Sequence, residues 1–420
     1  MSIVSGHSDL RRYLAARFFV GVATQVQTVA VGWQVFVATG SPFDLGLVAL
    51  SQFLPFVLLI LPAGHVADRY DRRRIQLLTY GLAAVCAAAL LGFAIAGVTD
   101  TAPVFGVMVL FGIVRAFNQP TSQALLPNLA PRELFPRAVA VNSTLGQVAT
   151  IAGPALGGAL VLFGVEVAYG LALAFLVVGV ILVAPLRAGG RAEASSEPLS
   201  WGTLLSGVNF VRSRRVVLGS ISLDLFAVLF GGATALLPIY AGDILDVGPV
   251  GLGAMRTAPA VGAAILAAAV AIRPIRRGVG RWMFGGVAAY GLATIVFGIS
   301  TSFALSLAAL GIMGAGDMVS VYIRHLLVQL ETPDAIRGRV SAVNAVFIGA
   351  SNELGEFESG ITAAWWGIVP AVIVGGAATL AVGLSWMRIF PELWRLDRFP
   401  ATEGDSRVTD PLTVESARDR

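Results

Sequence analysis

The residues of this sequence best suited to chemistry are ionisable side chains that lie inside long apolar stretches. There are seven clear cases: Arg115, Asp224, Arg256, Asp317, Glu353, Glu356 and Glu358. If these stretches cross a bilayer, each charge is costly to bury and marks a path for an ion or a substrate. They indicate proton binding by carboxylates and contact with a charged substrate by arginines.

Proton coupling near the middle of the membrane can use only the carboxylates of this chain. The 29 basic residues are all arginine, which stays protonated at any pH that a protein meets. The three histidines lie at or near the predicted cytoplasmic side. The proton-coupling candidates are therefore Asp224, Asp317, Glu353 and Glu356. Replacing Glu353 or Asp224 with the neutral amide should abolish pH-driven transport and leave folding largely intact.

Spacing separates the three glutamates of the eleventh apolar stretch. Glu353 and Glu356 are three residues apart and share a helix face, whereas Glu358 points elsewhere. Two carboxylates that face one cavity repel each other, so one of them tends to keep its proton. This pair is therefore a candidate proton carrier.

Several polar residues could line a substrate cavity. The candidates are Arg115, Gln27, Gln119, Asn118 and Arg256. Arg115 could hold an anionic substrate, with Gln119 one turn further along the same face. An alternative stays open, in which Asp224 or Asp317 forms a static ion pair with one of the two arginines and only holds the protein together.

The composition is typical of a membrane protein. Of 420 residues, 56% are hydrophobic and 13% charged, whereas a soluble domain carries about 25% charged residues. Twelve apolar segments have the length of about 20 residues that a helix needs to cross a bilayer. They cover residues 14–38, 44–66, 75–97, 102–124, 138–162, 166–186, 216–240, 250–272, 282–301, 303–326, 340–362 and 366–387.

Arginine placement predicts the orientation of these segments, because basic residues are retained in short cytoplasmic loops. The loop after every even-numbered segment is rich in arginine, as in Arg72, Arg73 and Arg74 after the second. The intervening loops contain no arginine. Both termini are therefore predicted to be cytoplasmic.

A polar stretch at residues 187–215 divides the segments into two sets of six. Residues 137–142 (RAVAVN) resemble residues 339–344 (RVSAVN) at matching positions, and parallel duplication of this kind is a transporter architecture. The predicted fold is all-α, with two pseudo-symmetric six-helix bundles at residues 14–186 and 216–388. Asn142 and Asn344 end these repeats and are predicted to cap helices.

The remaining residues are predicted to form cytoplasmic segments. Residues 1–13 form the N-terminus, and residues 389–420 form a partly disordered tail. The linker at 187–215 is predicted to contain a short amphipathic helix on the membrane surface, or else a loop that packs against nothing. The helix would place Trp201, Leu204, Leu205 and Val208 on one face.

The loop after the second segment carries a recognisable motif. Gly64, then Asp68-Arg69 after three residues, and then Arg72 and Arg73 resemble the loop signature of the major facilitator superfamily. The resemblance implies a gate, in which a carboxylate pairs with arginine when the inner side is shut. Asp71 stands where the superfamily usually has a second glycine. Alternatively, the arginines only set the topology.

The fifth segment carries a stripe of small residues. Gly153, Pro154, Gly157 and Gly158 resemble the helix-five motif of antiporters in the superfamily. Small residues at this spacing let a second helix approach closely. Plain helix packing is the alternative interpretation.

Four further stretches narrow the resemblance. Residues 118–120 (NQP), 124–127 (ALLP), 140–143 (AVNS) and 352–360 (NELGEFESG) are similar to the branch that contains enterobactin exporters and macrolide-type efflux proteins. The similarity runs from about residue 10 to residue 398. It implies a secondary exporter with a central cavity lined mainly by segments one, four, seven and ten.

These observations predict a proton-driven exporter of a small amphiphilic molecule, such as a siderophore or a drug, that works by alternating access. The chain lacks lysine and so has no GxxxxGK[ST] loop for ATP. The expected partners are the substrate, protons and the lipid bilayer, the protein is predicted to be a monomer, and no cofactor or metal is expected. Basic residues are not gathered on a soluble domain, which argues against nucleic acid.

Three other functions make different demands on the sequence. An uptake or facilitative carrier would have the same fold, but the helix-five motif argues mildly against it. A transport-dead sensor or scaffold would tolerate loss of the buried charges. A polytopic enzyme would need a nucleophile or a metal cluster, and the three scattered histidines do not provide ligands for one.

Overall fold

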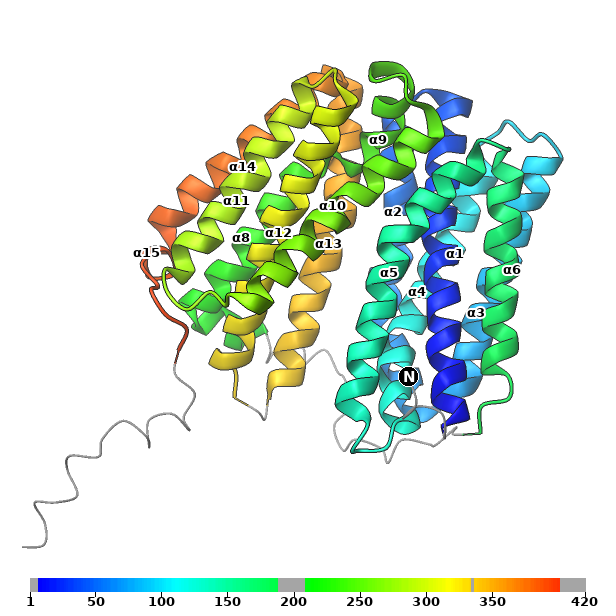
Figure 1. The fold of residues 1–420 in the computed structure, drawn as a ribbon, viewed down its shortest axis with the longest axis horizontal. Helices are drawn as coiled ribbons and strands as arrows, with labels where there is room; N and C mark the ends of the chain where they lie inside the picture. Colours follow the sequence, from blue (N-terminus) through cyan, green and yellow to red (C-terminus); the bar gives the residue numbers. More distant parts are fainter. Residues whose placement is uncertain (1–6, 188–207, 334–335, 401–420) are drawn as a thin grey trace, which may run out of the picture.

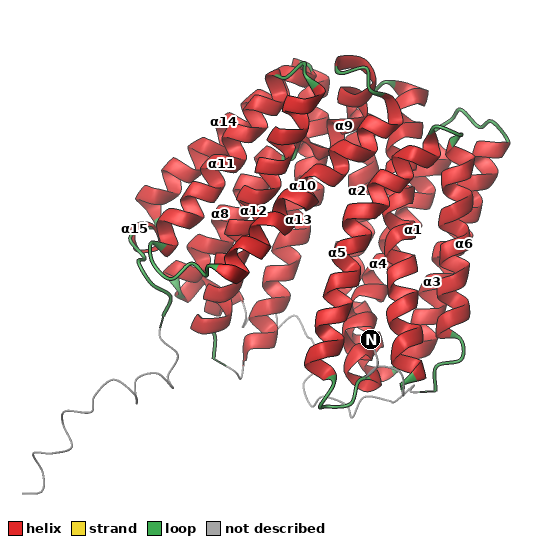
Figure 2. Cartoon of the chain, viewed as in Figure 1, coloured by secondary structure: helices red, strands yellow, loops and turns green. Residues whose placement is uncertain are grey.

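A computed structural model describes residues 7–187, 208–333 and 336–400 of the chain. Over these residues the structure consists of helices and short loops, without strands (Figure 2). The predicted amphipathic helix of the linker falls largely on residues 188–207, outside the described part. The same is true of residues 1–6 and of the tail from residue 401.

The first six long helices form one bundle. They alternate in direction, as the short loops between them require. Their bounds are α1 Ser8–Thr39, α2 Pro42–Arg69, α3 Arg72–Ile95, α4 Ala102–Leu129, α5 Phe135–Val161 and α6 Val165–Val183.

The second bundle repeats this arrangement, with an irregular first member. That member consists of α8 Arg215–Gly231, the 3-10 turn η2 Ala233–Leu236, α9 Leu237–Ile239 and the π-helical turn η3 Tyr240–Ile244. The rest are α10 Gly248–Ile272, α11 Val279–Ile299, α12 Phe303–Glu331, α13 Arg337–Trp366 and α14 Ile368–Ile389, followed by the short α15 Pro391–Trp394.

In the described part of the chain, eleven helices are long and apolar enough to cross a membrane. The remaining long helix, α13, has 30 residues and carries Glu353, Glu356 and Glu358. Its length suffices for a span, because a helix rises about 1.5 Å per residue. The all-helical fold of two bundles that the sequence predicts is thus confirmed.

The seventh span departs from the continuous helix predicted at residues 216–240. It breaks at Gly232, whose φ of −71° and ψ of 49° are not helical. Two successive glycines weaken the helix there. A Cβ on Gly232 would lie 2.7 Å from the carbonyl carbon of Gly355 in α13. The break therefore lets the backbones of two spans touch.

The prediction that Asn142 and Asn344 cap helices is wrong. α5 begins at Phe135 and α13 at Arg337, so Asn142 and Asn344 lie inside these helices rather than at their starts. Asn344 is buried, and its Oδ1 has no hydrogen-bond partner among the described residues. The two asparagines are thus placed to act as polar groups within the bundles.

The two bundles meet at one end of the molecule and diverge toward the other (Figure 1). The end where they diverge carries the N-terminus and the loop after α2, and we call it the arginine end. At the opposite end, α2 packs on α13 and α5 packs on α10. Glycines allow this, because a Cβ on Gly360 would lie 2.8 Å from the Cα of Gly46.

Candidate functional site

A salt bridge joins the two bundles. Arg115 of α4 donates a hydrogen bond from its Nη1 to Oε1 of Glu353 in α13. The Arg115 guanidinium also lies 4.9 Å from the centre of the Phe56 ring, in cation–π contact. The side chain of Arg115 is 42% exposed and that of Glu353 is 15% exposed. The pair is therefore partly solvated, and its two side chains can separate without leaving two charges buried away from water.

A second set of polar groups lies beside this salt bridge. The Thr234 hydroxyl of η2 donates to Oε1 of Glu356 at 3.0 Å. Glu356, Arg256 and Gln27 line one small cavity of about 60 Å³ between the bundles. The Arg256 Nε and Gln27 Oε1 are buried and have no hydrogen-bond partner among the described residues. A cavity of this size has room for water, which could satisfy such groups.

The charges at this interface balance. With all groups ionised, Glu353 and Glu356 carry two negative charges, and Arg115 and Arg256 carry two positive charges. Arg115 and Glu353 carry opposite charges on different bundles and stabilise the contact between them, whereas Arg256 and Glu356 both lie in the second bundle. Removing one charge of the Arg115–Glu353 pair therefore weakens the contact. Chemically, the interface suits a gate.

A different ion pair lies inside the second bundle. Oδ2 of Asp224 in α8 is 2.8 Å from Nη1 of Arg324 in α12, with side-chain exposures of 4% and 2%. The Ser320 hydroxyl donates to Oδ1 of Asp224 at 3.0 Å. Asp317 lies one turn from Ser320 and interacts electrostatically with both members of the pair. This cluster has two carboxylates and one arginine.

Sequence reasoning missed Arg324 and so misplaced the partner of Asp224. The open alternative named Arg115 or Arg256, and both lie at the bundle interface instead. A usable signal was present, because Asp317, Ser320 and Arg324 follow each other at three- and four-residue steps and share a helix face. Arg324 was overlooked because it lies near the arginine end of its span.

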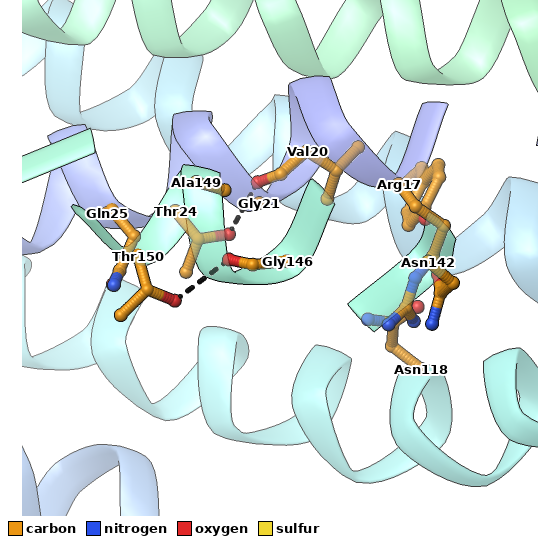
Figure 3. Close-up of a pocket in the computed structure, with 11 residues that line it drawn as sticks. Arg17, Val20, Gly21, Thr24, Gln25, Asn118, Asn142, Gly146, Ala149 and Thr150 are labelled. Atoms are coloured by element: carbon orange, nitrogen blue, oxygen red, sulfur yellow. Dashed lines mark hydrogen bonds between the residues drawn. The ribbon is translucent and has the colours of Figure 1, made fainter. Parts of the chain in front are cut away.

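The other substrate-cavity candidates do not reach the interface cavity. Oδ1 of Asn118 accepts a hydrogen bond from Nε2 of Gln76 at 2.5 Å, and Asn118 lines a separate pocket within the first bundle (Figure 3). Gln119 is half-buried, and its carbonyl accepts a bond from the Ser122 hydroxyl at 3.1 Å. Arg17, which sequence reasoning treated only as an orientation signal, also lines that pocket.

The predicted gating loop ties helix ends together. Arg72 donates to the carbonyl of Ala67 at 3.3 Å and to that of Ala124 at 3.0 Å. Arg73 donates to the carbonyl of Ala184, just past the end of α6. Terminal carbonyls lack helical partners, so arginines satisfy them well. Gly64 is buried and Arg69 is exposed, while the side chain of Asp68 lies outside the described residues.

Asp71, which replaces the usual glycine of the motif, caps a helix. Its Oδ1 accepts a hydrogen bond from the backbone N–H of Arg73 at 2.9 Å, at the start of α3. Its φ of −60° suits any residue. The loop is thus closed by an aspartate cap and does not need glycine at this position.

The helix-five residues make close contacts. A Cβ on Gly157 would lie 3.1 Å from the Cα of Val26 in α1, and Gly153 faces Gln25 of the same helix. Gly158 faces the other bundle, where its added Cβ would lie 2.9 Å from the Cα of Gly253 in α10. The carbonyl of Pro154 also meets Gly253. One stripe thus packs both within and between the bundles.

Gly158→Ala is expected to lower both stability and transport. The added methyl group meets backbone that cannot move aside, and overpacking of this kind costs about 1–3 kcal/mol. Gly170→Ala is the matched control, since its Cβ would meet nothing within 4 Å. Thermal unfolding in detergent and transport in vesicles provide the measurements. Equal behaviour of the two variants would contradict a tight contact between α5 and α10.

Two bundles of six long helices that meet across a charged interface define a polytopic membrane transporter. Residues 8–412 match the family described as transmembrane secretion effector. The chain belongs to this family of the major facilitator superfamily. The resemblance to the superfamily and to its enterobactin-exporter branch is thereby confirmed.

Known relatives agree with this assignment. The chain is 25% identical over 416 residues to the enterobactin exporter EntS of Escherichia coli O1:K1 / APEC, covering 97% of this chain and 98% of that protein. It is 26% identical over 411 residues to EntS of Citrobacter koseri, covering 95% and 96% of the two chains.

Solved structures share the fold. The nucleoside transporter NupG superposes with a TM-score of 0.67 at 16% identity, over 91% of this chain and 99% of that chain. A POT family transporter superposes with a TM-score of 0.72 at 13% identity, over 91% and 96% of the two chains. The family match and the relatives show that the protein is a multi-pass membrane transporter.

Proposed function

We propose that this protein exports a small amphiphilic molecule across the inner membrane of a bacterium in exchange for protons. Both termini are cytoplasmic in this proposal, so the arginine end faces the cytoplasm. One observation carries it: the Arg115–Glu353 salt bridge crosses the interface where the bundles meet, while the bundles diverge toward the arginine end. This arrangement corresponds to a transporter open to the cytoplasm and shut to the outside.

The salt bridge couples the two states in this proposal. In the state described here, Arg115 and Glu353 hold the two bundles together at the closed end. When the bundles rock and the opposite end opens, the pair separates. Return to the first state re-forms the pair and closes that end again, as alternating access requires.

Charge balance suggests a division of roles among the four candidate carboxylates. The interface set of Glu353 and Glu356 is already neutralised by two arginines. In the other cluster, Asp224 and Asp317 face a single arginine among the described residues, Arg324, so one negative charge is left. Binding one proton neutralises that cluster. We therefore assign proton carriage to the aspartates, with Asp317 as the group that titrates, and gating to the glutamates.

Inside-out vesicles test the direction and the energy source. With an acidified lumen, we expect the wild type to accumulate at least one probe from a panel of anionic dansylate, neutral dansylamide and cationic ethidium. A protonophore should abolish that accumulation. Uptake by right-side-out vesicles alone would contradict export, and accumulation that resists the protonophore would contradict proton exchange.

Glu353→Gln tests the gate in the same vesicles. We expect accumulation to fall by more than about tenfold, because the amide cannot form the charged pair with Arg115 that closes the gate. Stability should change little, since the pair is partly solvated. Glu392→Gln is the control, because Glu392 pairs with Arg215 at 3.1 Å on the exposed surface, where such pairs contribute little. Full activity of Glu353→Gln would remove this residue from the mechanism.

A further inference from the structure

A pocket of about 350 Å³ lies within the first bundle, apart from both carboxylate clusters. It is lined by α1, α4 and α5, with Tyr80 from α3. Figure 3 shows the side chains of Arg17, Asn118 and Asn142 near one another at one end of it. Pockets that bind small molecules start at about this size.

The charge on the lining of the pocket is positive. Among the described residues that line it, Arg17 is the only charged one, and none is a carboxylate. Among the described residues Arg17 has no salt bridge, and the titratable side chains beside it are the phenols of Tyr13 and Tyr80. In the described part of the chain no carboxylate therefore offsets the charge of Arg17 at the pocket, whereas Arg115, Arg256 and Arg324 all face carboxylates.

The neighbouring polar groups add hydrogen-bond donors. The Oδ1 of Asn118 is occupied by Gln76, which leaves its Nδ2 to donate. The amides of Asn142 and Gln25 line the same space. Guanidinium and amide N–H groups together match carboxylate, sulfonate, phosphate or phenolate oxygens.

The pocket also borders the gate. Thr24 of α1 lines both this pocket and the small interface cavity that contains Glu356 and Arg256. A molecule bound beside Arg17 would therefore lie on the arginine-end side of the closed interface. This is where a substrate awaiting export should bind.

We propose that the Arg17 pocket binds the anionic, acceptor-rich group of the transported molecule. The inference rests on the proposed function for its biological meaning, but binding itself does not require transport. It assigns the substrate a negatively charged oxygen group held by Arg17, Asn118 and Asn142. The apolar part of the molecule would lie along Val20, Gly21 and Ala149.

Equilibrium binding of two fluorescent probes to the full-length protein in lipid nanodiscs tests this site. Dansylate is a permanent anion, and dansylamide is a neutral molecule of nearly the same shape. We expect the wild type to bind dansylate about tenfold more tightly than dansylamide, as a hydrogen-bonded charge contact allows. Equal affinities, or no saturable binding of dansylate, would overturn the proposal.

Variants of Arg17 test whether this residue causes the preference for dansylate over dansylamide. In Arg17→Gln the affinity for dansylate should fall about tenfold while that for dansylamide stays within about twofold. Arg17→Lys should recover part of the loss, since it restores charge without the planar fork. Arg11→Gln is the matched control, because it removes an exposed charge from the same end of α1.

A second variant tests the same site independently, in case Arg17→Gln does not fold. Asn118→Asp keeps the shape and the acceptor for Gln76, but it adds a negative charge to the pocket. We expect it to weaken dansylate binding selectively as well. If both variants keep the wild-type preference for dansylate, the pocket is not the site.

The outcomes separate the two proposals. If vesicles move none of the probes but the Arg17-dependent preference persists, the proposed function fails and the site stands. If pH-driven transport persists and Arg17→Gln binds dansylate as tightly as the wild type, the site fails and the proposed function stands.

Discussion

Asp224→Asn is expected to lower the free energy of unfolding by about 3–5 kcal/mol, because it removes the carboxylate in direct salt-bridge contact with the buried Arg324, and Asp317 lies too far away to replace that contact. The pair is 2.8 Å apart, and both side chains are almost fully buried. The sequence alone favoured a variant that folds normally, and the buried pair changes that expectation. Thermal and denaturant unfolding of the purified protein would measure the loss.

The double variant Asp224→Asn, Arg324→Gln shows whether the pair causes this loss. Removing both charges eliminates the unpaired arginine, so much of the lost stability should return, whereas transport should not. Asp397→Asn is a control, since Asp397 and its partner Arg398 are both exposed. If the double variant is as unstable as Asp224→Asn, the ion pair is not the reason for the loss.

Asp317→Asn is expected to reduce pH-driven accumulation by more than about tenfold and to leave the protein folded. The amide imitates a protonated carboxyl group and cannot take up or release a proton. Arg324 keeps Asp224 as its partner, so no buried charge is stranded. Exchange of labelled for unlabelled substrate across the membrane moves no net protons, and it should therefore continue.

Loss of pH-driven accumulation together with continued substrate exchange distinguishes a proton carrier from a structural residue. Loss of both pH-driven accumulation and exchange would show that Asp317 serves folding or the conformational change instead. Asp100→Asn is the control, because Asp100 lies in the loop before α4 and accepts a bond from the N–H of Ala102 at 3.0 Å, as asparagine also can. Unchanged accumulation in Asp317→Asn would exclude the aspartate as the carrier.

Much of the fold could be read from hydropathy, because a bilayer forces each span to satisfy its own backbone. The predicted segments at 75–97 and 250–272, for example, lie within a few residues of α3 Arg72–Ile95 and α10 Gly248–Ile272. The seventh span was the exception. Its break at Gly232 lets the chain pass close to the backbone of Gly355 on another helix. A local sequence pattern does not contain that contact.

The candidate site was only partly predictable. A charge inside an apolar segment can be recognised from the sequence alone, so Arg115, Arg256, Asp224 and the other carboxylates could all be identified. Arg324 escaped notice near the end of its span, and Arg17 was indistinguishable from the arginines that set orientation. Burial separates Arg324 from the loop arginines, and a shared cavity separates Arg17 from them.

The sequence by itself therefore determined the spans, the arginine pattern, the family motifs and the short list of buried charges. Only the tertiary structure decided which charges meet: Arg115 with Glu353, 238 residues away, and Asp224 with Arg324. The physical reason is that a span depends on the apolar character of consecutive residues. Ion pairs depend instead on the depth and rotation of two helices that are packed side by side, which distant contacts set.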